Sequence, residues 1–140
     1  MLIHRKRKAI QTSGENDIVN ITSYVEEIVK ESGIKDGLMN VFCRGSTGGI
    51  TTIEYEEGLL NDFKIALLRL APKELNYEHN KKWPGDNNGR SHIRHSIVHS
   101  SLSIPISNGT PMLGTWQQVV VVNFDTQPRN REVSFTIIGK

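Results

Sequence analysis

The chain has 140 residues, of which 36% are hydrophobic and 23% are charged, a composition typical of one globular domain spanning residues 1–140. The net charge of +2 leaves no large electrostatic footprint for nucleic acid, and the absence of any apolar run of about 18 residues argues against a membrane span. A single cysteine excludes an intrachain disulfide, and the chain start lacks the apolar core of a signal peptide, so we expect a cytoplasmic protein.

The first part of the chain predicts one helix followed by two strands. A basic cluster at residues 4–8 is typical of a solvated chain end or of a charged edge strand. Residues 17–32 place apolar side chains at the spacing of one helix face, and Gly33 ends this helix. Residues 37–44 and 50–56 then predict strands, because the second segment in particular is rich in β-branched side chains.

The middle of the chain predicts two helices separated by a long polar loop. Residues 58–72 carry a continuous apolar stripe at helical spacing, which makes this the clearest helix of the sequence. The stretch 76–91 is long, polar and glycine-containing, as in functional loops. For residues 90–98 we favour a short helix over a strand. Such a helix would point His92 and His95 one way and its isoleucines towards the core.

The last part of the chain predicts strands. Residues 101–106 and 111–124 flank Asn108 and Gly109, a pair that tolerates positive φ and is therefore a strong hairpin signal. An uninterrupted run of valines within the second segment predicts a strand that is buried on both faces. Residues 131–138 alternate and predict a final strand. The order of elements predicts the α+β class with largely antiparallel pairing.

Residues 77–99 hold four of the five histidines and are the main candidates for chemistry. Neutral imidazole is the commonest protein ligand for transition metals. We therefore expect a divalent metal, zinc or magnesium, with His79 and His92 as ligands. A third or fourth ligand could come from His95, Asp86 or Glu54. The alternative interpretation is a set of exposed loop histidines without a shared site.

Two further stretches suggest phosphate binding. The glycine-rich turn 45–49 follows a strand, so its backbone N–H groups, with Ser46 and Thr47, could cradle an oxyanion. Arg129 and Arg131 lie two residues apart, which points both guanidinium groups to one side of a strand. The alternatives are an ordinary turn and a solvated charged face.

Three stretches in sequence order resemble one family: "GSTGGITTIEYEEGLLNDFKIALLRLAP", "YEHNKKWPGDNNGRSHIRHS" and "SIPISNGTPMLGTWQQVVVVNFDTQPRNREV". They are similar to the YjbQ family, small proteins catalogued as secondary thiamine-phosphate synthases. The likeness runs from about Ile18 to Gly139, and its most specific pieces are Leu113–Gln117 and the pattern Asn88-x-x-Ser91-His92.

The resemblance implies a compact β-sandwich with two main flanking helices and a long polar site loop, assembled as a homotrimer. It also implies a polar pocket near the subunit boundaries. The implied positions in this chain are Glu54, His79, Asp86, Asn88, His92, Gln117, Arg129 and Arg131. Of these we expect Glu54, Asp86, Asn88 and His92 to be catalytic. Gln117 and the two arginines join Ser46 and Thr47 as residues that bind substrate or phosphate.

The sequence also departs from the family pattern. Many members have His-Thr-Thr-Ala where this chain has residues 45–48, so a family acid, base or ligand is missing here. Positions 95 and 99 are commonly small in relatives, so His95 and His99 are expected to be neighbours of the site.

Two functions follow as hypotheses. The first is an enzyme that couples a pyrimidine diphosphate to a thiazole phosphate with loss of pyrophosphate. This activity would be incidental, since the dedicated synthases of this kind are (β/α)₈ barrels of about 250 residues. The second is a non-catalytic trimeric module that binds a metal or a small phosphorylated metabolite.

Overall fold

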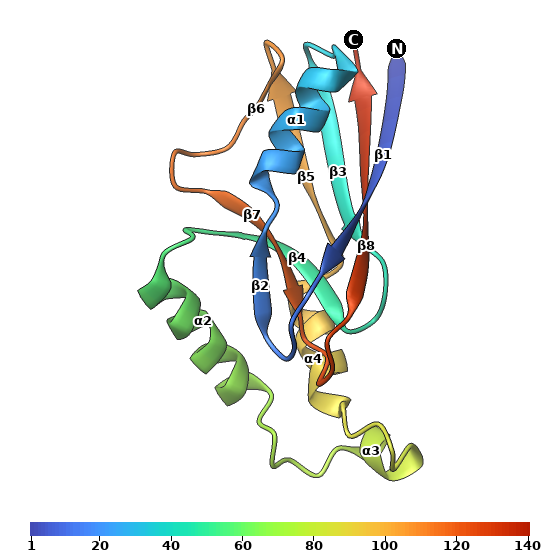
Figure 1. Cartoon of the computed structure of the whole chain (residues 1–140), viewed down its shortest axis with the longest axis vertical. Helices are drawn as coiled ribbons and strands as arrows, with labels where there is room; N and C mark the ends of the chain where they lie inside the picture. The colour runs from blue at the N-terminus through green and yellow to red at the C-terminus, as the bar shows by residue number, and fades with distance from the viewer.

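The computed structural model of the protein describes residues 1–140, which form eight strands and four helices (Figure 1). One sheet has the strand order β1-β8-β3-β5-β6 and the other has the order β2-β7-β4. Every strand pair is antiparallel. The first sheet contains β1 (Leu2–Gln11), β8 (Asn130–Gly139), β3 (Gly37–Cys43), β5 (Ser101–Ser107) and β6 (Thr110–Pro111). The second contains β2 (Asp17–Asn20), β7 (Gln118–Asn123) and β4 (Gly48–Ile53). The predicted α+β class is confirmed.

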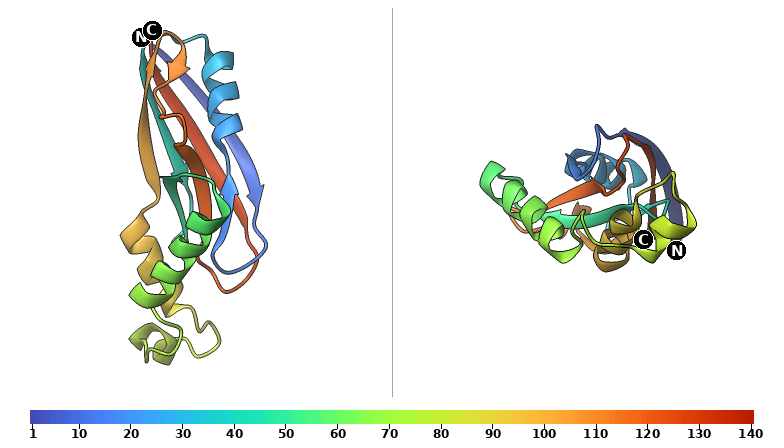
Figure 2. Two further views of the ribbon diagram at one scale, coloured as in Figure 1. Left: turned by 90° about the vertical axis from the view of Figure 1, so that its left-hand side faces the viewer. Right: turned by 90° about the horizontal axis from the view of Figure 1, so that it is seen from below.

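The helices lie along the sandwich and at one end of it. They are α1 (Thr22–Ser32), α2 (Glu57–Leu70), α3 (Glu78–Lys82) and α4 (Gly89–Val98). Figure 2 shows a molecule elongated along the strands, with α2, α3 and α4 at the end away from both chain termini. None of these helices combines the length and the apolar character that crossing a membrane requires.

The core lies between the two sheets and beneath α1. Its main cluster contains 17 buried hydrophobic residues, and a second cluster of five lies under α2. The four valines Val119–Val122 of β7 are all fully buried, because this strand lies between β2 and β4 and is covered on both faces. The prediction of a doubly buried strand is confirmed. This burial fixes the position of β4, the strand from which the site is built.

Several predicted boundaries are correct. Gly33 ends α1 in the left-handed conformation at φ 70°. Asn108 and Gly109 form the predicted hairpin between β5 and β6 with φ values of 50° and 73°. The basic residues 4–8 lie on β1, an edge strand of the larger sheet, as one of the two interpretations expected.

Two predicted elements are shorter than expected. Residues 17–20 are not helical, because they pair with β7 as strand β2, and α1 begins only at Thr22. The predicted strand 111–124 is broken after Pro111 by a turn, in which the backbone N–H of Gln117 donates to the carbonyl of Gly114. In both segments, hydrogen-bond partners from elsewhere in the chain determine where the element begins or ends.

The predicted inner face of α4 is wrong. In α4, Ile93 and Ile97 are 44% and 53% exposed, whereas Arg90 and Arg94 are buried. Polar partners from other segments compensate the buried charge and outweigh the apolar pattern. In α2, Leu60, Phe63 and Leu67 of the apolar stripe pack on the second core cluster, and the rest of the stripe stays at the surface. These helices therefore present apolar side chains outwards.

Candidate functional site

The predicted site residues fall into two groups at opposite ends of β4. We call the first group the basic end; it comprises Ser46, Thr47, His79, Asn88, His92, Arg129 and Arg131. We call the second group the acidic end; it comprises the predicted residues Glu54 and Gln117 together with Tyr55, Glu56 and Trp116, which were not predicted as site residues. The six residues of β4, roughly 20 Å of extended chain, separate Thr47 from Glu54. Asp86 belongs to neither group and is exposed in the loop between α3 and α4.

Two imidazoles lie together at the basic end. His79 comes from α3 and His92 from α4, and their ring centroids are 4.6 Å apart. Nε2 of His79 lies 3.1 Å from Oδ1 of Asn88, so the Nε2-protonated tautomer donates to that oxygen. Burial and the neighbouring His79 lower the pKa of His92 below its ordinary value of 6.5, with Asp125 acting in the opposite direction. At neutral pH, His92 is therefore uncharged and able to accept a proton.

The predicted arginine pair converges on one polar network. Nη2 of Arg131 donates to the carbonyl and the hydroxyl oxygen of Thr47, both at 2.9 Å, and to Oδ1 of Asn123. The Thr47 hydroxyl donates to Asp125, and Nε of Arg129 donates to the same carboxylate at 2.9 Å. The structure thus brings Arg129 and Arg131 together through Thr47 and Asp125.

Arg131 is buried without a carboxylate partner. Its side chain forms no ion pair, and its Nε is fully buried with no hydrogen-bond partner. Desolvation accordingly lowers the pKa of the Arg131 guanidinium from its ordinary value. Arg129 is half exposed, and only its Nε is bonded, so its two terminal nitrogens face outwards without a protein acceptor. The basic end therefore has donor capacity for an anion.

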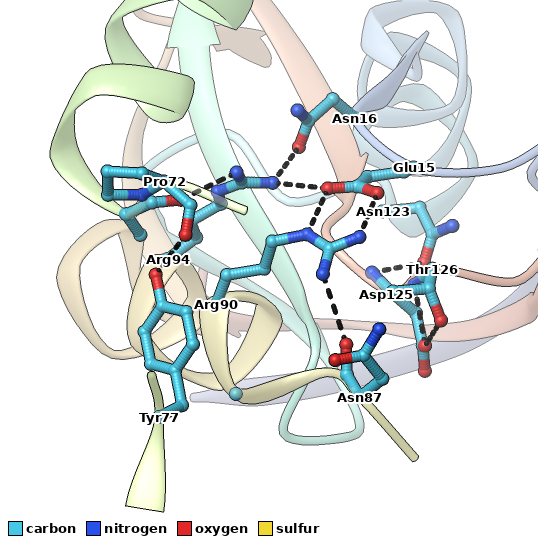
Figure 3. A network of polar contacts seen from close by, with 12 residues as sticks. Glu15, Asn16, Pro72, Tyr77, Asn87, Arg90, Arg94, Asn123, Asp125 and Thr126 are labelled. Carbon is cyan, nitrogen blue, oxygen red and sulfur yellow. Dashed lines mark hydrogen bonds and ion pairs between the residues drawn. The ribbon is translucent and has the colours of Figure 1, made fainter. Parts of the chain in front are cut away.

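A second ionic network, which the sequence did not predict, holds α4 in place (Figure 3). The carboxylate of Glu15 accepts from Nε and Nη2 of Arg90 at 2.7 and 2.8 Å, and from Nη1 of Arg94 at 2.8 Å. Arg94 also donates to the carbonyl of Ala71 at the end of α2. These contacts tie the β1–β2 loop, α2 and α4 together. The i, i+4 spacing of the two arginines was the one sequence signal that could have revealed them.

His95 also lies at the basic end, although we expected it only as a neighbour. Its Nδ1 is 2.6 Å from the carbonyl oxygen of Gly48, which requires the Nδ1-protonated tautomer if His95 is neutral. This contact fixes α4 against the first residue of β4. His99 ends α4 with φ 83° and is exposed, so it makes no comparable contact.

The donors present do not fit the expected metal. No group of three or more His, Cys, Asp or Glu side chains in the chain is arranged to hold a metal ion. Asp86 is exposed on its loop, and Glu54 lies at the other end of β4. The pair His79 and His92 alone supplies fewer ligands than the three protein donors of a typical catalytic zinc site. The predicted set of three or four ligands therefore does not form within this chain.

The acidic end is ordered by the pairing of β4 with β7. Ile53 lies opposite Gln118, and this register brings the segment after β4 next to the turn 114–117. Gln117 fastens the turn, because its Nε2 donates to Thr52 Oγ1 at 3.2 Å and its Oε1 accepts from Gly114 N at 3.0 Å. The predicted substrate contact Gln117 therefore holds a turn within its own chain.

Comparison with known proteins agrees with the fold. The family model described as "UPF0047 protein YjbQ-like" matches residues 6–140. This chain belongs to the YjbQ family. A UPF0047 protein from Methanothermobacter thermautotrophicus is 36% identical over all of this chain and 95% of its own length. The Bacillus subtilis protein YugU is 31% identical, with 96% and 98% of the two chains covered.

Solved structures of YjbQ-family proteins have the same architecture. A YbjQ-like protein of unknown function from Sulfolobus solfataricus superposes with a TM-score of 0.94 at 27% identity, covering 99% of both chains. A yjbq/upf0047 family protein from Clostridium acetobutylicum gives a TM-score of 0.86 at 36% identity, covering 95% of this chain and 99% of its own. The names of these YjbQ-family relatives assign no reaction.

Proposed function

We propose that this YjbQ-family protein binds the phosphate groups of a small metabolite at its basic end and catalyses transfer there, as in thiamine-phosphate synthesis. The observation that carries the proposal is the buried guanidinium of Arg131, which forms no direct ion pair with any carboxylate. Buried charges in proteins are normally paired, because an isolated charge in a low-dielectric interior is costly. An anion on the free donors of Arg129 and Arg131 would supply the missing countercharge.

The charges around the basic end support the same proposal. Four arginines, at positions 90, 94, 129 and 131, share only the carboxylates of Glu15 and Asp125. Two of these arginines, Arg90 and Arg94, lie on α4, and the other two lie just before and on β8. Planar guanidinium groups hold two phosphate oxygens at once, a geometry that a lysine does not reproduce.

The proposed reaction needs charge stabilisation more than it needs proton transfer. A carbon–nitrogen bond forms between the thiazole nitrogen and the pyrimidine methylene carbon as the carbon–oxygen bond to the diphosphate breaks. Arg129 and Arg131 would stabilise the charge that develops on the leaving diphosphate. Neutral His92, beside His79 and Asn88, would accept a hydrogen bond or proton from the bound substrate. A metal is no part of this proposal, because the donor set does not fit one.

We also propose that the protein works as a homotrimer. The exposed apolar residues support an assembly: they are Leu59, Ile65, Leu68 and Leu70 on α2, and Ile93 and Ile97 on α4. Such surfaces commonly mark interfaces. The family resemblance supplies the number three. Light scattering at micromolar concentration should give about three times the 15.8 kDa chain mass, and a clean monomer contradicts this assembly.

Calorimetry with pyrophosphate tests the phosphate site. Arg129→Lys and Arg131→Lys should each weaken binding roughly tenfold to a hundredfold, since a charge-assisted hydrogen bond contributes about 1.5–3 kcal/mol. Arg69→Lys on α2 is the matched control, because this exposed arginine lies outside the basic end. Unchanged affinity in both site variants contradicts the phosphate site. Because Arg131 is buried, each variant is first checked for a native unfolding transition.

The non-catalytic module is the second candidate, because Gly45 stands where many relatives have a histidine. Formation of thiamine phosphate from the two phosphorylated precursors separates the two functions. An enzyme should show saturable turnover that His92→Gln abolishes while pyrophosphate binding persists. If the unmodified protein binds pyrophosphate but shows no turnover, the protein is the non-catalytic binding module.

A further inference from the structure

The acidic end contains a hollow with a volume of about 380 Å³. Its lining consists of Asn20, Glu54, Tyr55, Glu56, Trp116 and Gln118. The volume lies within the range of about 300–1,000 Å³ that small-molecule sites occupy. The hollow has no part in the proposed phosphate chemistry, because it lies at the opposite end of β4.

Hydrogen bonds fix most of the wall. The Tyr55 hydroxyl donates to the carbonyl of Ile18 at 2.9 Å, which anchors the far end of the ring. Nδ2 of Asn20 donates to Oε1 of Gln118 at 3.1 Å across the β2–β7 pair. The Glu56 carboxylate caps α2 by accepting from the backbone N–H groups of Gly58 and Leu59. Hydrogen bonds therefore hold the residues around the hollow in fixed positions.

The charge of the wall has one sign. Two carboxylates, Glu54 and Glu56, line the hollow, and no Lys, Arg or His is among its lining residues. The Glu54 side chain forms no hydrogen bond and no ion pair, so both of its oxygens are available. This negative character contrasts with the net charge of +2 on the whole chain.

The aromatic side chains of the hollow are unusually open. Trp116 is 71% exposed and Tyr55 is 43% exposed, although large aromatic side chains normally bury most of their surface. The negative face of an aromatic ring attracts a cation, and tryptophan does so most strongly. Aromatic faces beside carboxylates form the kind of recognition site that binds quaternary and protonated amines.

From this combination we infer that the acidic end binds a small organic cation, a quaternary ammonium or a protonated amine. The cationic head lies against Trp116 and Tyr55, and the free carboxylate of Glu54 neutralises its charge. Asn20 and Gln118 offer polar atoms to the remainder of the ligand, although their amide groups also pair with each other. A phosphate group would be repelled here, so the two ends of β4 select opposite charges.

The test uses the fluorescence of Trp116 in a Trp83→Phe background, because the chain has only two tryptophans. The probes are choline and 3,3-dimethylbutan-1-ol, which has nearly the same shape without the charge. Choline should change the emission saturably and bind at least about tenfold more tightly than the neutral probe. Equal affinity for the two probes overturns the cation site in favour of a merely apolar hollow.

Two variants provide the matched comparison. Glu54→Gln should weaken choline binding about fivefold or more, as expected for loss of a carboxylate beside the cation. Glu57→Gln removes the same charge nearby but lies outside this hollow, and it should leave the affinity within about twofold. Equal effects of the two variants would show only a general negative field and contradict a specific site.

The alternative to a ligand is that a second copy of the chain covers the hollow. In that case the Trp116 emission is blue-shifted, as for a buried ring, neither probe changes it, and dilution shifts it to longer wavelength. This result overturns the inference and assigns the hollow to a subunit interface. Pyrophosphate binding is measured on the same variants. Because Glu54 lies outside the basic end, the result separates failure here from failure of the proposed phosphate site.

Discussion

The two ends of β4 differ in how their charged groups are stabilised. At the basic end and in the adjoining Glu15 network, Arg131 and Arg94 are buried and donate to carbonyl, amide, hydroxyl and carboxylate oxygens from distant segments. At the acidic end, Glu54 and Trp116 are exposed, and only their neighbours are fastened. The basic end is thus part of the folded interior, whereas the acidic end is a surface feature on a rigid frame.

This difference shows that the desolvation cost of a charged side chain depends on where along β4 it lies. Gly48 begins β4 beneath α4, where water is excluded and each charge requires a partner. Ile53 ends β4 at the edge of the smaller sheet, where water solvates whatever follows. Changes at the basic end should therefore alter stability and function together. Changes at the acidic end should alter function alone.

The largest expected effect is the loss of Glu15. In Glu15→Ala, the two guanidiniums of Arg90 and Arg94 remain buried without their shared carboxylate. Breaking a buried ion pair typically costs about 3–5 kcal/mol, and because the Glu15 side chain is 27% exposed we expect about 3 kcal/mol. Urea unfolding measures the loss. Glu54→Ala at the acidic end is the control and should change stability by less than about 0.5 kcal/mol.

The same carboxylate predicts a direction with pH. Hydrogen bonds from Arg90 lower the pKa of Glu15 below the ordinary 4.5. Its stabilisation is therefore complete above pH 4.5 and is lost as the pH falls through the lower folded-state pKa. In Glu15→Ala this part of the acid destabilisation should disappear. An acid unfolding profile that keeps its wild-type shape in the variant contradicts the role given to Glu15.

The second effect concerns the space that Gly48 leaves for Arg131. A Cβ atom at position 48 would lie 3.0 Å from Nε of Arg131 and 3.1 Å from Sγ of Cys43. Because three acceptors hold Arg131, Gly48→Ala should cost about 1–3 kcal/mol and weaken pyrophosphate binding. Gly114→Ala at the acidic end would meet only ordinary contacts, with Gln117 at 3.7 Å, and should be nearly neutral in urea unfolding. Similar losses in both variants would remove the contrast between the ends.

The sequence predicted the elements better than their faces. The strand β8 follows from local alternation, and α2 follows from its apolar stripe. The buried face of α4 was not predictable in this way, because the partner of Arg90 is Glu15, 75 residues earlier in the chain. From the local sequence alone an arginine is expected at the surface, because its burial depends on the Glu15 carboxylate far away in the chain.

The site followed the same rule. His79, Asn88 and His92 lie together as the polar loop suggested, and Arg129 and Arg131 share one network as their spacing suggested. Glu54 could not be separated from them by sequence alone, because only the pairing register of β4 with β7 places it beside Trp116. Residue type selected the candidate residues, and topology divided them into two places.

A third, smaller effect comes from the protonation of His92. Burial and the neighbouring His79 hold its pKa below 6.5, so it is neutral at pH 7 and gains a positive charge only at lower pH. Sulfate stays divalent throughout this range and isolates the change on the protein. We expect sulfate affinity to rise roughly fivefold as the pH falls below that pKa. The positive charge on His92 and the sulfate dianion should attract each other by about 1 kcal/mol at a separation of about 8 Å in water. Calorimetry between pH 8 and pH 5 measures the rise, and His92→Gln should reduce it.

The smallest expected effect concerns Gln117, the residue that fastens the turn at the acidic end. Gln117→Leu removes two exposed, neutral hydrogen bonds, to Thr52 and to Gly114. Because both bonds are exposed to water, each should contribute no more than the lower end of the usual range, about 0.5 kcal/mol, so global stability should fall by less than about 1 kcal/mol. Trp116, next in the chain, should gain local motion, which lowers its fluorescence anisotropy in the Trp83→Phe background. Thr52→Val removes only one of the bonds and should give a smaller decrease. If anisotropy stays unchanged in both variants while stability falls as far as in Glu15→Ala, the acidic end is as interior as the basic end, and the contrast between them is wrong.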